Sequence, residues 1–230
     1  MKLQFINRRI LPAAALIFIF IIFVSCQKST SNSNIQVDPL ADVHPTVIME
    51  GDVKIGPYTQ IGAGTILTGE ITIGHHSLVQ TNCSLRGIIS VGNYVHIYDN
   101  CNLEGGRPAN VGSVTNTEPD QLIIGDSCWI NHGSVMHGTQ MGAGSAVGLG
   151  AACDYNTRIG KGAILANGSA TRINQIIPDN AFAEGVPAIV KITDIDDNFR
   201  TEYFGLNPKG WIEYEAPERE IEIKEKYGLK

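Results

Sequence analysis

The sequence has few charged or aromatic residues, and its basic residues form no cluster after residue 26. Of its 230 residues, 17% are charged and 7% are aromatic, and the formal net charge is −6. A surface that binds nucleic acid needs grouped Lys and Arg side chains to neutralise phosphates. The composition therefore excludes a nucleic-acid partner, and it also lacks the high charge density of disordered chains.

Long apolar runs are missing after the N-terminal segment. Residues 10–24 form an apolar run that is shorter than the roughly 20 residues of a typical membrane-spanning helix. Basic residues precede this run, so we interpret residues 1–25 as a signal peptide. The run ends in Phe-Val-Ser-Cys at residues 23–26, which resembles a bacterial lipobox with a lipidated Cys26. An uncleaved anchor is the alternative. Both interpretations predict an exported protein anchored to a bacterial membrane. With a lipidated Cys26, the protein would be a periplasmic or outer-membrane lipoprotein.

The rest of the chain divides by composition into a linker, a domain and a C-terminal flank. Residues 26–40 are rich in Ser and Asn and have no apolar period, which predicts a flexible linker. The domain is predicted at residues 41–190, with a loop at residues 105–121. Residues 191–230 form the flank, and its charged helical segments would cap or flank the domain.

The domain contains an aliphatic residue at every sixth position. The first run is Ile55, Ile61, Leu67, Ile73, Val79, Leu85, Val91, Ile97 and Leu103. The pattern resumes after the loop and continues to Leu165, with a shift of one residue between Met136 and Met141. A small or β-branched residue follows most members by four positions, and 25 glycines supply turns. Short strands of this kind must stack on copies of themselves, and a six-residue period is typical of a parallel β-helix.

We therefore predict an all-β fold, a parallel β-helix built on hexapeptide repeats, with C-terminal helical segments. Three repeats make one coil of 18 residues. The pattern resembles that of the left-handed hexapeptide-repeat proteins. The left hand is taken from this resemblance, because the period alone does not fix the handedness of a crossover.

The 18-residue coil predicts which side chains are vertical neighbours. Arg86 and Glu104 share one column. If the coil resumes after the loop on the expected face, His137 lies above Glu104 and His132 lies above Asp99. Neighbouring rungs are about 4.8 Å apart, so Glu104 and His137 can reach one ion. An extended stretch of about 15 Å around a corner separates His132 from them.

A homotrimer would bring the three groups together, because His132 of one subunit would face Glu104 and His137 of the next. Three protein ligands and an open fourth position are typical of catalytic zinc, which lowers the pKa of bound water to ~7. This arrangement predicts one zinc or iron ion at each subunit interface.

Five groups of segments occur in the order found in gamma-class carbonic anhydrases. They are Val43-His44-Pro45-Thr46; Ser84-Leu85-Arg86-Gly87; Val91-Gly92-Asn93 with Asp99-Asn100; Asn131-His132-Gly133 with Val135-Met136-His137-Gly138; and Gly185-Val186-Pro187-Ala188. The chain resembles that family over roughly residues 43–200, and His132 and His137 match two of its three metal-binding histidines. The resemblance implies a carbonate dehydratase-like lyase that hydrates carbon dioxide reversibly with metal-bound hydroxide. Arg86 and Asp99 would orient bicarbonate and the interface.

Three positions depart from the family pattern. Glu104 replaces the first histidine, Ile88 replaces the aspartate of an Arg-Gly-Asp sequence, and Tyr98 replaces the glutamine before Asp99. A glutamate can bind zinc, but an anionic ligand makes the bound water less acidic than neutral imidazoles do. Glu104 is therefore either a metal ligand or a structural partner of Arg86, and the sequence leaves both open.

Two other functions compete with carbon dioxide hydration. The segment Asp126–Ile130 and the Gly-Val-Pro-Ala sequence also resemble hexapeptide-repeat acyltransferases, in which His132 would be the general base for an acceptor hydroxyl. Export of the protein disfavours this function, since acyl-coenzyme A is cytosolic. The third candidate is a catalytically lapsed, lipid-tethered trimeric scaffold, for which Glu104 is no obstacle.

The remaining reactive side chains are interpreted as structural. His75 and His76 are expected to be exposed turn residues. Four cysteines occupy inward positions of the repeat and are expected to be buried: Cys83, Cys101, Cys128 and Cys153. Cys83 and Cys101 are vertical neighbours, so a disulfide between them is open in an oxidising compartment.

Overall fold

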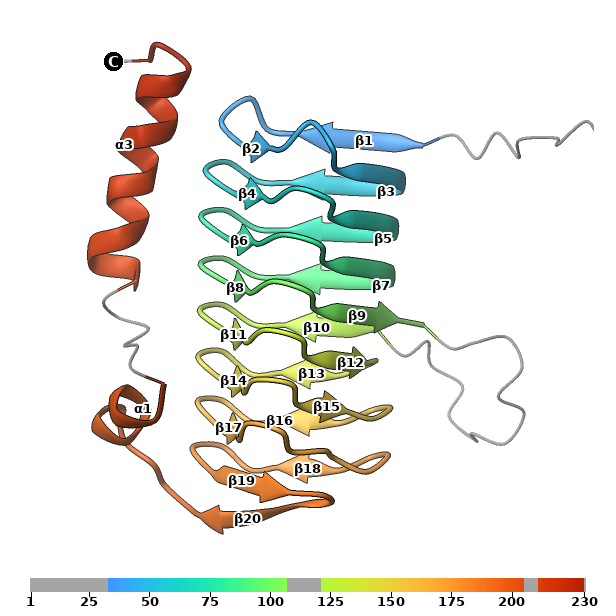
Figure 1. Cartoon of the computed structure of the whole chain (residues 1–230), viewed down its shortest axis with the longest axis vertical. Coiled ribbons are helices and arrows are strands. Elements are labelled where there is room, and N and C mark those ends of the chain that lie inside the picture. The colour runs from blue at the N-terminus through green and yellow to red at the C-terminus, as the bar shows by residue number, and fades with distance from the viewer. Residues whose placement is uncertain (1–32, 107–120, 205–210, 230) are drawn as a thin grey trace, which may run out of the picture. The chain divides into compact units, whose positions relative to one another are not determined.

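The computed structural model describes residues 33–106, 121–204 and 211–229. The predicted signal peptide, its lipidation site Cys26 and most of the loop at residues 105–121 lie outside these residues. Over most of the described chain, short strands wind into a left-handed parallel β-helix whose coils stack one on another (Figure 1). The predicted fold class is therefore confirmed.

Two hydrogen-bonded sheets make up the walls of the β-helix. The first sheet contains, in order, β2 (Asp42–Val43), β4 (Gln60–Ile61), β6 (Leu78–Val79), β8 (His96–Ile97), β11 (Trp129–Ile130), β14 (Ala146–Val147), β17 (Ile164–Leu165), β19 (Phe182–Gly185) and β20 (Ala188–Ile192). The second contains β1 (Asn34–Val37), β3 (Ile48–Ile55), β5 (Ile66–Ile73), β7 (Ser84–Val91), β10 (Leu122–Ile124), β13 (Gln140–Met141), β16 (Arg158–Ile159) and β18 (Ile176–Ile177), joined by β9 (Asn102–Gly105), β12 (Val135–His137) and β15 (Ala152–Cys153). All pairs are parallel except β19 with β20.

The aliphatic column of the sequence forms the core. None of its nine members up to Leu103 exposes more than 4% of its surface. After the loop the strands resume in the predicted register, since Ile124 pairs with Val91 and Met136 pairs with Leu103. The small inward positions are buried as well. The hydroxyl of Thr65, for example, donates to the carbonyl oxygen of Gln80 on the next rung at 2.9 Å. Threonine is tolerated inside because its hydroxyl finds a backbone acceptor there.

Glycines allow the long strands to turn a corner of the coil. β3, β5 and β7 continue through Gly51, Gly69 and Gly87, whose φ angles are +92°, +122° and +92°. These three glycines lie in register on successive rungs. A Cβ on Gly87 would overlap the carbonyl oxygen of Gly105 on the rung above. Glycine is required there both for its backbone conformation and for the close approach of the next rung.

The start of the domain differs from the prediction. Residues 34–37, which the sequence assigned to a flexible linker, form β1 and pair in parallel with β3. The physical reason is that β3 offers a row of backbone donors and acceptors at the edge of the sheet, which a preceding extended segment satisfies. Composition favoured a linker because these backbone hydrogen bonds leave no trace in side-chain type.

In the described part of the chain, two α-helices follow the β-helix, as the charged segments of the flank predicted. They are α1 (Asp197–Phe204) and α3 (Ala216–Lys226), and a short π-helical turn at Trp211–Glu215 leads into α3. α3 is tied to the first coils rather than to the last ones. Arg219 donates to Gln60 at 2.5 Å, and Lys226 donates to Asp42 at 2.6 Å. Among the described residues, no helix is long and apolar enough to cross a membrane.

The structure corrects the interpretation of His75 and His76 as exposed turn residues. Only 15% of the His76 side chain is exposed, and its ring stacks on Tyr94 with centroids 5.1 Å apart. His76 Nε2 also lies 3.4 Å from the Glu220 carboxylate of α3. This burial removes hydration from the imidazolium and lowers the pKa of His76. The sequence could not reveal it, because the site where α3 packs is set by tertiary contacts.

The four inward cysteines are buried free thiols. Cys83 Sγ lies 3.0 Å from the carbonyl oxygen of Tyr98, and Cys101 Sγ lies 3.2 Å from that of Asn131. The disulfide between Cys83 and Cys101 that the sequence allowed is therefore not formed in this structure.

Candidate functional site

The structure brings the predicted site residues together as two carboxylate–imidazole pairs. His132 Nδ1 lies 3.3 Å from Asp99 Oδ2, and His137 Nε2 lies 3.9 Å from Glu104 Oε2. In both pairs the imidazole comes from the rung that follows the carboxylate, as the 18-residue coil predicted, and His137 pairs in register with Glu104. All four side chains are about one-third exposed or more, so each pair is open to a ligand or to a second subunit.

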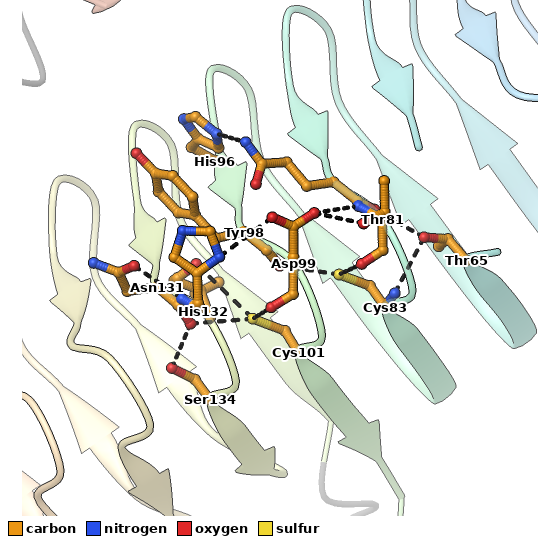
Figure 2. A network of polar contacts seen from close by, with 12 residues as sticks. Thr65, Thr81, Cys83, His96, Tyr98, Asp99, Cys101, Asn131, His132 and Ser134 are labelled. Carbon is orange, nitrogen blue, oxygen red and sulfur yellow. Dashed lines mark hydrogen bonds and ion pairs between the residues drawn. The ribbon is translucent and has the colours of Figure 1, made fainter. Parts of the chain in front are cut away.

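Thr81 holds the Asp99 carboxylate in place (Figure 2). Its hydroxyl and its backbone N–H both donate to Asp99 Oδ1, at 2.7 and 2.8 Å. These bonds stabilise the charged form, the hydroxyl bond most, and they hold the pKa of Asp99 below its ordinary value of 3.8. Asp99 is therefore an anion at neutral pH, and its second oxygen is presented to His132.

His132 is positioned by the turn that carries it. Its backbone N–H donates to Asn131 Oδ1 at 2.9 Å, and Ser134 Oγ donates to the carbonyl oxygen of Asn131 at 2.7 Å. The ring packs beside Tyr98, with centroids 4.6 Å apart (Figure 2). Nδ1 faces the Asp99 anion at 3.3 Å, which in the neutral ring favours the tautomer with the proton on Nδ1 and the lone pair on Nε2. A neutral imidazole with a basic Nε2 is the form needed for general-base catalysis.

An aromatic layer supports this turn, and no sequence motif predicted it. The Tyr98 ring stacks on His96, with centroids 4.1 Å apart and planes 8° apart. Burial lowers the pKa of His96 to about 3 and raises the pKa of Tyr98 to about 12, so both rings are neutral at neutral pH. Trp129 lies against both rings. Tyr98 occupies the position where the resemblance led us to expect glutamine, and here it provides an apolar wall beside His132.

Thr81 was also missed, although the sequence contains a signal for it. It stands 18 residues before Asp99 and so occupies the rung below. Thr81→Val should raise the pKa of Asp99 toward 3.8, because the hydroxyl donor is lost while the backbone donor remains. Since the folded-state pKa is depressed, this interaction stabilises the fold above the unfolded-state pKa and disappears as pH falls through the folded-state pKa. A carboxyl NMR titration tests this, with Thr81→Ser as control. An unchanged Asp99 pKa in Thr81→Val would show that the hydroxyl contributes nothing.

Glu104 faces His137 rather than Arg86. The guanidinium of Arg86 donates to Asn102 Oδ1 at 3.3 Å, and within the described residues it makes no ion pair with Glu104 or Asp99. The structural pairing of Glu104 with Arg86, which the sequence left open, is therefore not formed. The His137 ring stacks on Tyr155, with centroids 4.9 Å apart, which limits its rotation. Glu104 and His137 are left as a pair of oxygen and nitrogen donors on adjacent rungs.

This pair fits two positions of a metal site. Donors that share a tetrahedral zinc lie roughly 3.3 Å apart, given metal–ligand distances of about 2.0–2.1 Å. The 3.9 Å between Glu104 and His137 needs only a small side-chain adjustment. Within the described part of a single chain, no three His, Cys, Asp or Glu side chains are arranged to hold a metal ion.

Comparison with known proteins gives the fold but no family. No family model matches the sequence, and no curated protein matches it. Among solved structures, a Bacillus cereus protein provisionally described as an acetyltransferase is 21% identical with a TM-score of 0.53, over 81% of this chain and 92% of that chain. A hexapeptide transferase family protein from Anaplasma phagocytophilum is 20% identical with a TM-score of 0.51, over 82% and 90%. At these identities the likeness shows a shared β-helix fold and does not show activity.

Proposed function

We propose that the protein is an acyltransferase in which His132 is the general base and Asp99 orients and stabilises it. The observation that carries this proposal is the contact between His132 Nδ1 and an Asp99 carboxylate that Thr81 fixes by two hydrogen bonds. Nε2 of His132 takes a proton from the hydroxyl or amine of an acceptor. The acceptor attacks the carbonyl carbon of an activated acyl donor, the bond to the leaving group breaks, and the leaving group accepts a proton.

Two further observations favour acyl transfer over metal-dependent hydration. The base and its orienting carboxylate both lie within one chain, whereas the described residues of one chain do not supply three metal ligands. Two solved structures that share this fold are described as transferases. The proposal does not depend on coenzyme A. If the protein is lipid-anchored at Cys26, as we also propose, its donor would be another activated acyl group, because acyl-coenzyme A is cytosolic.

The first experiment is an acyl-transfer assay on the full chain. Acetyl-coenzyme A and p-nitrophenyl acetate are the donors, and pools of hydroxyl and amine compounds are the acceptors. We expect release of the leaving group that depends on the acceptor, an acetylated product by mass spectrometry, and no effect of a metal chelator. Turnover that the chelator abolishes would favour the metal site below. Absence of acceptor-dependent turnover with either donor would contradict the proposal and leave the scaffold function.

A gamma carbonic anhydrase-like activity is the second candidate, and the register of Glu104 with His137 is what favours it. In a homotrimer, His132 of the neighbouring subunit would complete the set with zinc or iron. The metal would act as a Lewis acid and acidify its water. Both carboxylate–imidazole pairs would then serve one site, and His132 would bind the metal instead of acting as a base.

Metal content separates the two candidates. For the metal site we expect about one zinc or iron per chain by mass spectrometry, lost in both Glu104→Ala and His137→Ala, together with carbon dioxide hydration. Glu202→Ala, on an exposed position of α1, is the control for purification effects. A metal-free protein that remains a trimer would eliminate this candidate and leave acyl transfer untouched.

A further inference from the structure

The C-terminal flank covers an outward-facing column of the first sheet. β6, β8 and β11 each give one residue to the core and one to the outer face, and the outward residues Leu78, His96 and Trp129 pair in register. Although they point away from the core, none of them exposes more than 8% of its surface. Ile212, shortly before α3, packs against the apolar cluster that contains Leu78 and Trp129, and α3 stands beside the turns of the first coils (Figure 1). The column is therefore buried by the C-terminal flank.

His96 is the titratable member of this column. Its ring belongs to the aromatic layer described above, and its Nε2 lies 3.3 Å from Gln80 Nε2. Burial is the main reason why the pKa of His96 is about 3. The charge of Arg219 on α3 and the neighbouring His132 lower this pKa further, while Asp99 opposes the shift. A proton on His96 is therefore strongly disfavoured while the flank is docked.

A second histidine lies under α3 itself. The ring of His76 is held between Tyr58 and Tyr94, with centroids 4.8 and 5.1 Å from its own. Its Nδ1 lies 2.9 Å from Nδ1 of His75, and its Nε2 lies 3.4 Å from the Glu220 carboxylate. A hydrogen bond between two Nδ1 atoms needs one of them without a proton, so this contact disfavours charging both rings.

The Glu220 carboxylate does not fully compensate a charged His76. Lys224 Nζ donates to the other Glu220 oxygen at 2.5 Å, and it also lies 5.7 Å from the centroid of the Tyr58 ring. The carboxylate that faces His76 from α3 is thus shared with an ammonium group. Burial lowers the pKa of His76 and outweighs the hydrogen bond with Glu220, which raises it. An imidazolium at this position is therefore more stable in water than under the docked helix.

Few apolar contacts hold α3 in place. Of its 11 residues, Ala216 and Ile223 are buried. Polar contacts of Arg219 and Lys226 with the first coils supplement them. A helix of this length is marginal in water by itself, so α3 depends on its docking surface. A modest change in the free energy of docking is enough to release it.

We propose that α3 is a pH-dependent cover, docked at neutral pH and released in mildly acidic surroundings by protonation of His76 and His96. Release exposes the aromatic layer against which His132 packs, so acid loosens the support of the candidate base. This consequence for catalysis rests on the proposed function, whereas release of the helix does not.

The direction of the pH dependence follows from the two histidines. Both have a lowered pKa while α3 is docked and return toward the ordinary value of 6.5 once it is released, so the released state binds more protons. Docking is therefore fully stabilised above about pH 6.5 and weakens as pH falls below that value. The pKa of Glu220 is held below its ordinary value of 4.5, first by its bond with Lys224, so this carboxylate stays charged in the same range.

The test is hydrogen–deuterium exchange of the full chain at pH 7.5 and pH 5.0, read by mass spectrometry and corrected for intrinsic exchange rates. We expect protection of the α3 amides to fall by roughly tenfold or more at pH 5.0, while protection of β5 and β7 is unchanged. His76→Gln combined with His96→Gln should bring the ratio of α3 protection at the two pH values close to one. His44→Gln, at an exposed histidine that contacts Thr46 on its own turn, is the matched control and should keep the wild-type ratio.

Each variant is compared with itself, so a constant loss of docking strength cancels in the ratio. If the double variant does not dock at pH 7.5, the single variants decide, and each should show a smaller ratio than the wild type. Full α3 protection in the wild type at pH 5.0, or an undiminished ratio in the variants, would overturn the proposal. Loss of protection in β5 and β7 together with α3 would indicate acid unfolding of the domain and would overturn it as well. The readout needs no turnover, so failure of the acyltransferase proposal is detected separately by the assay above.

Discussion

Replacing His132 with alanine should lower kcat for acyl transfer by roughly two to four orders of magnitude, the usual contribution of a general base. The acceptor would keep its proton, so attack on the acyl carbonyl would lose its driving force. KM should change little, because His132 acts on the proton of the acceptor in the reaction step. The side chain is 43% exposed, so the melting temperature should hardly change. Steady-state kinetics with thermal denaturation measures both quantities.

Two companion variants make the result specific. Asp99→Asn keeps the size of the side chain but removes the charge that orients His132, and it should also lower kcat with little change in KM. Leu149→Ala alters an exposed residue on the turn above His132 and should leave kcat unchanged. If His132→Ala retained full activity, the base would have to be another residue, and the proposed function would lose the observation that carries it.

Gly87→Val should destabilise the domain by about 2–6 kcal/mol. The backbone of Gly87 has a φ of +92°, which costs a non-glycine residue about 1–3 kcal/mol. A Cβ would also overlap the carbonyl oxygen of Gly105, so the rungs must separate, and forced expansion of a packed structure costs a further 1–3 kcal/mol. The free energy of unfolding in urea measures the total.

Gly168→Ala is the matched control for the backbone contribution alone. Gly168 has a φ of +64°, and no atom lies within 4 Å of a Cβ built on it. We expect a loss of about 1–2 kcal/mol, from strain without overlap. Equal losses in the two variants would mean that the contact between Gly87 and the next rung adds nothing, and that the corner is held by backbone conformation only.

The vertical neighbours of the candidate site could be predicted from the sequence because the β-helix is nearly one-dimensional. Each rung contacts the rung before and the rung after, so an 18-residue count places His132 above Asp99 and His137 above Glu104. Both placements are confirmed. The same count places Thr81 one rung before Asp99, a position for which no role was predicted.

The six-residue period does not predict the other contacts in the site. The stacking of Tyr98 on His96 depends on side-chain rotamers, which a period does not specify. Glu104 had two open partners, Arg86 and His137, on the two adjacent rungs, and only side-chain directions decided in favour of His137. The pairing of β1 with β3 was likewise missed, because backbone hydrogen bonds place few demands on side-chain identity.

The six-residue period was enough to predict the fold class, the buried columns and the pairing of rungs across the loop, because it repeats one local rule at every turn. The tertiary structure alone decided where the C-terminal helix docks. It placed Tyr227 next to Ala41 and the Glu220 carboxylate beside His76. Contacts between rungs follow from a fixed separation along the chain, so a repeat predicts them. The contact between Tyr227 and Ala41 joins residues 186 positions apart, and it depends on surfaces that exist only once the coils have formed.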